Sequence, residues 1–474
     1  MQQGLAAVVG VIIARELGRT AETDGFFAAY GVFLVLAIAA TAARIVLLPP
    51  LARARDERRL VGETVGFAVA LMWVAVPLLV VAIVAADGIA SVLTGFDEGA
   101  ARETAAESLP WLVAAALAQL FAGLAASALA ALDDYRTAAL GYAAGSILGL
   151  VFILSRIDED GIDAVVRGVA LNGFVALAVP SLGLVLRARR RSGGGRLLTR
   201  AGFRRPASRL GLVLAGVAFP LALQGAYLIC LPFAADEGIG AVTSLGYAYI
   251  AGSAVITITS SALALVTSVP LTRAGLDPAR VARHVESSSW IGFIAVAVTT
   301  GVFALVGPQL AETVLGGTYG SAVGRELGRL VVTLAPWMLV TVGIVAAFPL
   351  AFVVGRGRAL PAAAAAVVSV QLPLAWIGDA LAGVYGLAIA LALSTCLGLV
   401  LVLRILGAAR LALLGLGATA AVVSTLAIVS FVPPGLLLAP GIAALCGIAL
   451  FVTALLVTRP AGLRSGWSYL RALS

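Results

Sequence analysis

The sequence contains no lysine, so all 32 of its basic residues are arginine, and charged residues make up only 12% of its 474 positions. A soluble domain is usually about 25% charged and 45–50% apolar. Here 61% of the residues are hydrophobic and the mean hydropathy is +1.07. A soluble chain could not keep that much apolar surface from water. The composition therefore excludes a soluble enzyme, a secreted disulfide scaffold and a disordered tail, and it indicates an integral membrane protein.

Residues that carry catalysis or hold metals are also scarce. The three cysteines lie within apolar runs and show no metal-binding or redox spacing. The single histidine, His284, stands between Arg283 and Glu286, and we expect it in a solvated loop. The glycine run 193–195 is not followed by Gly-Lys-Ser/Thr, so it is not a phosphate-binding loop. The sequence predicts no catalytic residue, metal or cofactor, which leaves an ion gradient or the membrane potential as the energy source for transport.

Continuous apolar runs alternate with short polar loops along the whole chain. A membrane-spanning helix needs about 20 apolar residues, whereas a barrel strand would alternate apolar and polar residues. The runs therefore predict an all-α polytopic membrane protein with about fourteen transmembrane helices. We place these spans near residues 4–17, 26–48, 62–86, 108–132, 137–155, 164–186, 209–233, 241–269, 288–311, 330–354, 359–377, 382–406, 409–432 and 436–457.

The charges sort by side when fourteen spans alternate across a membrane. One side receives 25 of the 32 arginines and 7 of the 24 acidic residues, and the other side receives the remaining arginines and acids. Cytoplasmic loops carry the basic excess in membrane proteins. The split predicts that both termini are cytoplasmic in a bacterial inner membrane. It also predicts that the arginine clusters contact anionic lipids and not nucleic acid.

Two sequence features suggest a chain built from parallel halves. The pattern Pro-Leu-x-Arg-Ala occurs at 50–54 and again at 270–274, and Ala-Tyr precedes each copy at a similar distance. An even number of spans between the copies preserves orientation. We therefore predict a first six-helix lobe at 1–187, a basic linker at 188–208, a second six-helix lobe at 209–407, and two further helices with a tail at 408–474. The first span is short, because its apolar stretch ends at Arg15, so either it tilts or the protein begins upstream.

Polar residues at membrane depth are the candidates for a transport cavity. Arg44 and Arg404 lie near cytoplasmic ends, from which they can extend to the interface. Neutral polar residues inside spans either line a cavity or form hydrogen bonds between helices. These candidates are Gln119, Asn172, Gln224, Tyr249, Thr257, Thr259 and Gln371.

The start of the chain resembles a known family. The stretch from Ile13 to Gly18, followed by Thr-Asp-Gly-Phe-Phe at 23–27, is similar to the A-R-x-x-G and T-D-x-F-F pattern of MurJ/MviN-type flippases. These belong to the multidrug/oligosaccharidyl-lipid/polysaccharide exporter superfamily. The resemblance implies a flippase that moves a lipid-linked cell-wall precursor to the outer leaflet by alternating access. It adds Arg15, Asp24 and Tyr30 as cavity candidates, and cell-wall synthesis proteins as candidate partners.

The chain departs from that family at two cavity positions. Family members carry arginine in helices 2 and 8, where this chain has Ala37–Ile38 and Ala251. Other functions therefore stay open at this point. They are export of another polysaccharide or O-antigen-type lipid-linked oligosaccharide, cation-coupled drug export, a polytopic enzyme acting on lipid-linked glycans, and a scaffold without transport activity. Short outer loops weigh against the enzyme.

Overall fold

The structure is a computed structural model that describes residues 2–56, 59–96, 99–192, 206–261, 277–316, 321–460 and 462–464. Every regular element within these ranges is helical. The chain divides by its internal contacts into two compact units, unit 1 (Met1–Val242) and unit 2 (Thr243–Ser474).

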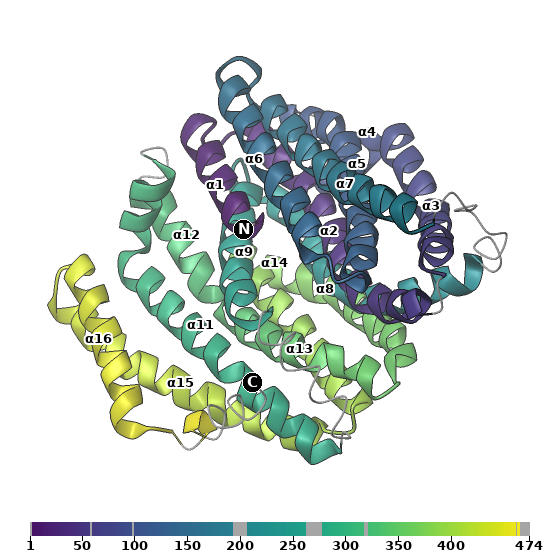
Figure 1. The fold of residues 1–474 in the computed structure, drawn as a ribbon. Coiled ribbons are helices and arrows are strands. Elements are labelled where there is room, and N and C mark those ends of the chain that lie inside the picture. Colours follow the sequence, from purple (N-terminus) through teal and green to yellow (C-terminus); the bar gives the residue numbers. More distant parts are fainter. Residues whose placement is uncertain are drawn as a thin grey trace. The chain divides into compact units, whose positions relative to one another are not determined.

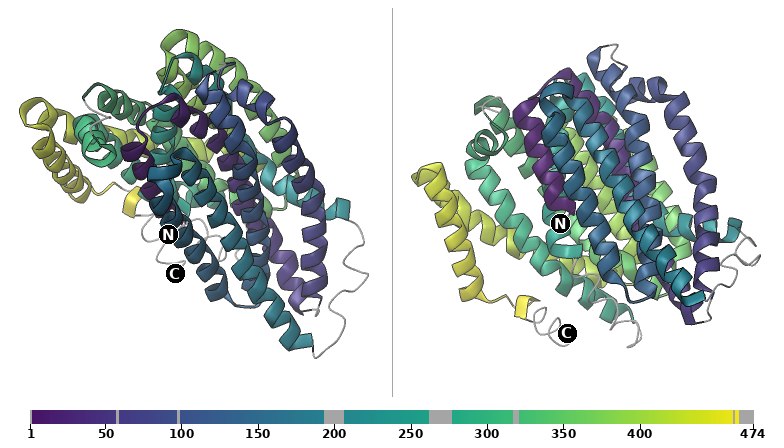
Figure 2. Two further views of the ribbon diagram at one scale, coloured as in Figure 1. Left: turned by 90° about the horizontal axis from the view of Figure 1, so that it is seen from above. Right: turned by 45° about the horizontal axis from the view of Figure 1, so that its top comes forward.

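Unit 1 is a bundle of long helices. Their bounds are α1 (Gln2–Glu16), α2 (Ala21–Asp56), α3 (Leu60–Val84), α4 (Ala86–Leu93), α5 (Ala100–Ala131), α6 (Tyr135–Asp160), α7 (Ile162–Ser192) and α8 (Pro206–Asp236). Helix α2 packs against α5 and α8, and α7 packs against α5 and α6 (Figure 1). Figure 2 gives two further views of these helices. Leu47 and Leu51 of α2, Phe67 of α3, Leu124 of α5 and Val213 of α8 belong to one buried apolar cluster.

Glycines allow α6 and α7 to approach closely. Gly141, Gly145 and Gly149 recur every fourth residue, so they lie on one face of α6. A Cβ added at Gly145 would lie 2.6 Å from the backbone oxygen of Asn172 in α7. Helices in lipid lack a hydrophobic drive to associate, so close packing of small residues takes its place.

Unit 2 contains the remaining helices. Their bounds are α9 (Ala241–Ile256), whose first two residues belong to unit 1, the π-helix η2 (Thr257–Ser261), α11 (Pro278–Leu315), α12 (Ser321–Thr333), α13 (Ala335–Val353), the 3₁₀-helix η4 (Gly357–Ala359), α14 (Leu360–Ile405), α15 (Ala409–Leu437) and α16 (Pro440–Thr458). Helix α11 packs against α12, α13 and α15, and α15 packs against α16 (Figure 1).

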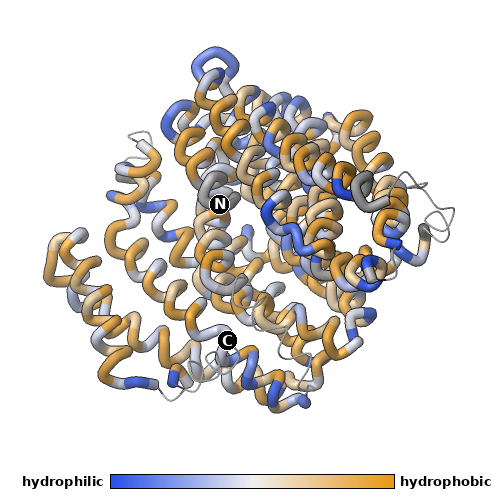
Figure 3. Tube along the Cα trace, viewed as in Figure 1, coloured by the Kyte–Doolittle hydropathy of each residue, from blue (hydrophilic) through white to orange (hydrophobic). Residues whose placement is uncertain are grey.

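Twelve helices are long and apolar enough to cross a membrane within the described ranges. This confirms the predicted all-α polytopic membrane fold, whereas the count of fourteen stays a prediction. Helix α1 has only 15 residues. Helix α14 counts once although its backbone is not helical at Ala382 and Gly383, where Gly383 has a φ of 54°. Figure 3 shows mainly hydrophobic residues along the helices, with polar residues mostly at helix ends and in loops.

Two local predictions need correction, and two others fall wholly or mostly outside the described residues. His284 is not in a solvated loop, because it lies in α11 with 1% of its surface exposed. The helix predicted near 26–48 is longer than expected, because α2 continues through Pro49 and Pro50 to Asp56. The second copy of the repeat, at 270–274, and most of the basic linker lie outside the described residues.

The contact-based division differs from the predicted lobes. Helix α8, which we expected to open the second lobe, packs on α2 and α3 and belongs to unit 1. Compactness and internal repetition are different properties, so the lobe boundaries stay a prediction.

Candidate functional site

The long helices of unit 1 have two ends, and ion pairs and close contacts link the segments at each end. The acidic end comprises residues 20–24, 84–104, 157–163 and 235–241, excluding the undescribed 97–98. The arginine-rich end comprises residues 53–60, 131–136, 187–192 and 206–209, excluding the undescribed 57–58. These two names refer to unit 1 alone.

The Thr-Asp-Gly-Phe-Phe motif forms the first turns of α2 at the acidic end. Thr20 and Thr23 cap the helix reciprocally, since the backbone N–H of each donates to the side-chain oxygen of the other, at 2.9 and 3.3 Å. This arrangement satisfies donors that a helix N-terminus would otherwise leave free. It also holds the first turn of α2, from which the side chain of Asp24 projects.

The rest of the motif packs α2 into the bundle. Gly25 allows contact with α5, because a Cβ there would overlap the backbone oxygen of Ala101. Phe26 and Phe27 are each 2% exposed. The ring of Tyr30 stacks on Phe26 and on Phe33, with centroids 5.4 and 5.1 Å apart. Tyr30, a predicted cavity residue, is thus the half-buried member of a mostly buried aromatic row on α2.

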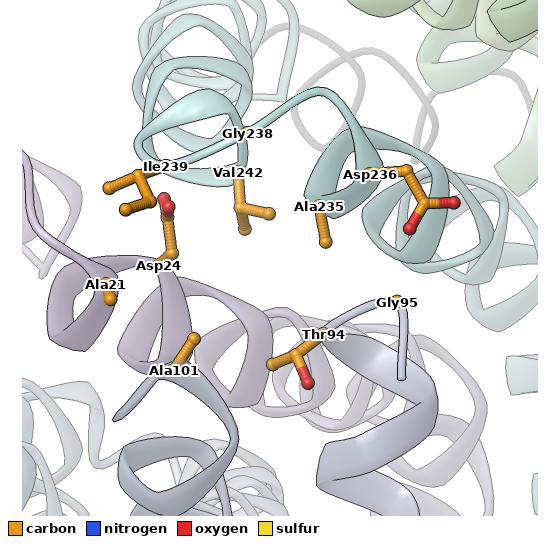
Figure 4. Close-up of a pocket in the computed structure, with 10 residues that line it drawn as sticks. All are labelled: Ala21, Asp24, Thr94, Gly95, Ala101, Ala235, Asp236, Gly238, Ile239 and Val242. Carbon is orange, nitrogen blue, oxygen red and sulfur yellow. The ribbon is translucent and has the colours of Figure 1, made fainter. Parts of the chain in front are cut away.

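Asp24 lines a cavity of about 150 Å³ at the acidic end. Its carboxylate accepts a hydrogen bond from the backbone N–H of Gly240, just before α9. Figure 4 shows this carboxylate pointing from α2 toward the α8–α9 connection, with Asp236 across the pocket pointing away from it. A buried carboxylate beside a helix N-terminus is stabilised by backbone N–H groups. Arg15 is not among the pocket residues and is exposed in the last turn of α1.

Arg44 is a polar residue whose environment the sequence did not reveal. It lies within the span of α2, where its guanidinium donates a hydrogen bond to the hydroxyl of Tyr142 in α6. The guanidinium carbon also lies 4.6 Å from the centre of the Tyr142 ring. The side chain therefore reaches sideways to a neighbouring helix instead of extending along α2 to the interface. Since helix faces repeat after two turns, Arg44 shares a face with Ala37, seven residues earlier.

The arginines at the arginine-rich end have carboxylate partners. Arg209 of α8 binds Glu63 of α3 through two nitrogens, at 2.9 and 3.1 Å from one carboxylate oxygen. Arg55 lies 2.7 Å from Asp133, and Arg187 lies 2.8 Å from Asp134. Each pair joins residues that are at least 53 positions apart in the sequence.

Asp134 also caps α6, because its carboxylate accepts a hydrogen bond from the Thr137 backbone N–H at 3.2 Å. Burial on its own raises the pKa of the Asp134 carboxyl. Hydrogen bonds from Thr137 and the charge of Arg187 outweigh burial and hold that pKa below its ordinary value.

The predicted polar residues of unit 1 lie on different helix pairs. Gln119 is buried on α5. Asn172 of α7 packs over Gly145 and Gly149 of α6, and its side-chain oxygen is buried without a hydrogen-bond partner. Gln224 is half-buried on α8. None of these three is among the residues of the acidic-end pocket.

The predicted polar residues of unit 2 are also dispersed. Tyr249 packs on Trp337, with ring centres 4.7 Å apart, and Gln371 is fully buried on α14. Thr257 and Thr259 lie in the π-helix η2, where each hydroxyl donates to a backbone carbonyl one turn earlier, at 2.8 and 2.7 Å. π-Helical turns are frequent at functional sites. No group of three or more His, Cys, Asp or Glu side chains in the described ranges could hold a metal.

Comparison with solved structures finds proteins that share this architecture. The lipid II flippase MurJ, in an inward closed conformation, matches with a TM-score of 0.76 over 97% of both chains at 12% identity. An inward-facing multidrug resistance MATE family transporter of the MOP superfamily matches with a TM-score of 0.66 at 17% identity. That match covers 88% of this chain and 95% of the other. This chain shares the fold of these two structures.

The other comparisons set the limits of this result. A eukaryotic MATE transporter matches with a TM-score of 0.59 at 14% identity, over 89% of this chain and 95% of that one. No family model and no curated protein matches the chain. At these identities the likeness shows the fold alone. The MurJ-like architecture predicted from the sequence is confirmed at that level.

Proposed function

We propose that this protein is an inner-membrane flippase that moves a lipid-linked cell-wall precursor, such as a lipid II-like or other undecaprenyl-linked glycan, to the outer leaflet by alternating access. The observation that carries the proposal is the match to a lipid II flippase over 97% of both chains. The match to the MATE transporters has a lower TM-score. In this proposal the arginine-rich end of unit 1 faces the cytoplasm.

The motif at the start of α2 supports the same function. Thr23 and Asp24 occupy the capped first turn, and the aromatic pair that follows is buried. This geometry lets the family motif serve as a rigid end for α2 and places one carboxylate in a pocket. The proposed cavity residues remain Arg15, Asp24, Tyr30, Gln119, Asn172, Gln224, Tyr249, Thr257, Thr259 and Gln371. An ion gradient or the membrane potential would drive the cycle.

Complementation tests this function. The endogenous lipid II flippase of a bacterium is depleted while this chain is expressed, and growth and outer-leaflet lipid II are followed. We expect both to be restored. Full membrane expression without rescue would remove lipid II as the substrate. The same assay in a strain lacking its polysaccharide or O-antigen flippase would then test the other lipid-linked glycans.

Cation-coupled drug export is the second candidate function. The MATE matches favour it, and so does Asp24, a carboxylate that is 7% exposed inside unit 1. A drug exporter would lower the accumulation of cationic dyes in cells, and replacement of Asp24 by Asn would abolish this effect. Failure of both the rescue assays and the dye assay would leave the scaffold function, with cell-wall synthesis proteins as partners.

A further inference from the structure

Arg325 and Arg329 are two exposed arginines on α12 of unit 2. Among the residues that the structure describes, no carboxylate oxygen lies within ion-pair distance of either guanidinium. This holds also for Glu326, their half-buried neighbour on the same helix. The two arginines stand one helical turn apart, so both side chains project from one face of α12.

An arginine pair at this place needs a physical reason. The predicted topology puts residues 312–329 on the side opposite to the cytoplasm, where loops carry few basic residues. Three arginines of unit 1 on the same predicted side are neutralised by carboxylates at 2.5–2.8 Å. These pairs are Arg102–Asp87, Arg156–Glu159 and Arg167–Asp163. The positive face of α12 is not balanced in this way, so it can bind an anion from outside the fold.

The opposite face of α12 is packed against α11 (Figure 1). Leu327, Leu330 and Val331 are each 5% exposed or less, and their spacing places them on one side of the helix. A Cβ added at Gly307 of α11 would lie 2.9 Å from the Cα of Gly328, so the two helices touch through their backbones. This packing fixes α12 and directs its arginine face away from α11.

Helix lengths place α12 at the membrane surface. Helix α12 has 13 residues and is about 20 Å long, too short to cross a hydrocarbon core of about 30 Å. Helix α13 begins two residues after α12 ends. Its 19 residues give a length of about 29 Å, which nearly spans the core without α12. Helix α12 therefore lies at the level of the lipid headgroups, where basic amphipathic helices bind anionic lipids.

We propose that Arg325 and Arg329 form a docking site for the phosphate of an anionic phospholipid, such as phosphatidylglycerol, in the leaflet opposite to the cytoplasm. A guanidinium can donate two parallel hydrogen bonds to phosphate oxygens. Residues one turn apart have Cβ atoms about 5–6 Å apart, so both arginines can reach one headgroup. A bound headgroup would hold α12 at the surface and fix the depth at which α13 enters the lipid. The site goes beyond the proposed function, because it needs no lipid-linked substrate.

Quenching of a fluorophore on α12 by spin-labelled lipids tests this site. Ala322 is exposed on the arginine face, so Ala322→Cys is labelled with bimane in a full-length chain without the native cysteines. The protein is reconstituted in phosphatidylcholine vesicles that contain spin-labelled phosphatidylglycerol or, in a parallel sample, spin-labelled phosphatidylcholine at the same mole fraction. We expect phosphatidylglycerol to be enriched around the fluorophore by roughly threefold or more. In the double variant Arg325→Gln/Arg329→Gln the two lipids should quench equally.

A matched control reports on arginine that is already neutralised. Ser155 is exposed next to Arg156, so bimane on Ser155→Cys should show no preference for phosphatidylglycerol, and a preference as strong as that at Ala322→Cys would contradict the proposal. Equal quenching by both lipids at Ala322→Cys, or a preference that survives in the double variant with native-like gel filtration and thermal unfolding, would overturn it. Loss of the preference in millimolar inorganic phosphate at constant ionic strength would assign the arginine face to a soluble anion instead of a lipid.

Discussion

Asp24 illustrates how one side chain can serve both the fold and transport. Its carboxylate is buried, accepts from the Gly240 N–H and lines the acidic-end pocket. A structural role needs only an acceptor at this position, whereas a role in transport needs the charge. A substitution that keeps a hydrogen-bond acceptor but removes the negative charge can therefore distinguish the structural role from the role in transport.

Replacing Asp24 by Ala should destabilise the protein by about 1–3 kcal/mol, because the Gly240 N–H would lose its acceptor in a buried place. Asp24→Asn should retain most of that stability, since an amide oxygen can accept the same bond. Thermal unfolding in detergent measures both variants. If Asp24→Asn unfolds like the native chain yet loses transport, the charge itself is functional, whereas native-like transport would leave only the structural role.

Gly240 is required by two separate features of its position. Its φ is 88°, and an added Cβ would overlap the side chain of Arg19. Gly238 has a φ of 113° with no atom within 4 Å of an added Cβ. Alanine at Gly238 should therefore cost about 1 kcal/mol from backbone strain alone. Alanine at Gly240 should cost clearly more, and equal losses in thermal unfolding would show that Arg19 moves aside freely.

At the scale of helices, unit 1 is held together in two ways. Charged residues near helix ends pair with residues of neighbouring segments, and small residues along the helices allow close packing. Asp134 joins the start of α6 to the end of α7 by capping the former and pairing with Arg187. Arg209 and Glu63 join α8 to α3, and Arg209 also lies 5.8 Å from the ring of Phe67. Between such ends, glycine faces such as that of α6 set the distance between helices.

Stability should fall in acid partly through Asp134. A carboxyl whose folded-state pKa is depressed contributes stability that is present above its unfolded pKa and is lost as pH falls through the folded pKa. The unfolded value is close to 3.8. The unfolding temperature of the native chain should therefore drop as pH falls below about 4. The drop should be smaller in Asp134→Asn, which keeps a cap but cannot titrate. Parallel curves for the two proteins would contradict this assignment.

The Glu63–Arg209 pair should contribute measurably to unit 1. Its side chains are 26% and 13% exposed, so solvent screens the pair only partly. A double-mutant cycle with Glu63→Gln and Arg209→Gln should give a coupling energy of about 1–2 kcal/mol. The exposed pair Arg156–Glu159 is the control and should give about 0–0.5 kcal/mol. A similar coupling at both sites would show that burial does not strengthen the first pair.

At the scale of the whole molecule, the number of membrane crossings depends on how α14 is counted. An unbroken helix of its 46 residues would be about 69 Å long, over twice the thickness of a hydrocarbon core. The backbones of Gly378 and Gly386 instead come so close that a Cβ on Gly386 would overlap the Gly378 oxygen. The chain therefore turns back at Ala382–Gly383.

Side-specific labelling of single cysteines should show this reversal. In a background without the native cysteines, Arg358→Cys and Arg410→Cys should react from one side of the membrane, and Leu381→Cys from the other. All three positions are exposed. Labelling of positions 358 and 410 from opposite sides would mean that α14 crosses once, and it would contradict the fourteen-span topology. Reaction of positions 358 and 410 from the cytoplasmic side would support the predicted orientation.

The sequence predicted the class of fold, but it could not show what surrounds the individual polar residues. The T-D-x-F-F motif located Asp24, yet the motif could not show that the carboxylate binds Gly240, 216 positions later. Arg44 was assigned to the interface because helix position suggested it, whereas its partner Tyr142 lies 98 positions away. His284 was expected in solvent because charged residues flank it, yet helices that pack around α11 bury it.

The sequence by itself determined that this chain is a bundle of membrane helices, because hydropathy and run length are local properties and lipid admits few alternatives. Only the tertiary structure decided which charges are neutralised. The arginines at helix ends look alike in the sequence, yet three of them meet carboxylates from separate segments of the chain, and Arg44 meets an aromatic ring. The cost of a buried charge depends on its neighbours in space, and helix packing brings those neighbours from far along the chain.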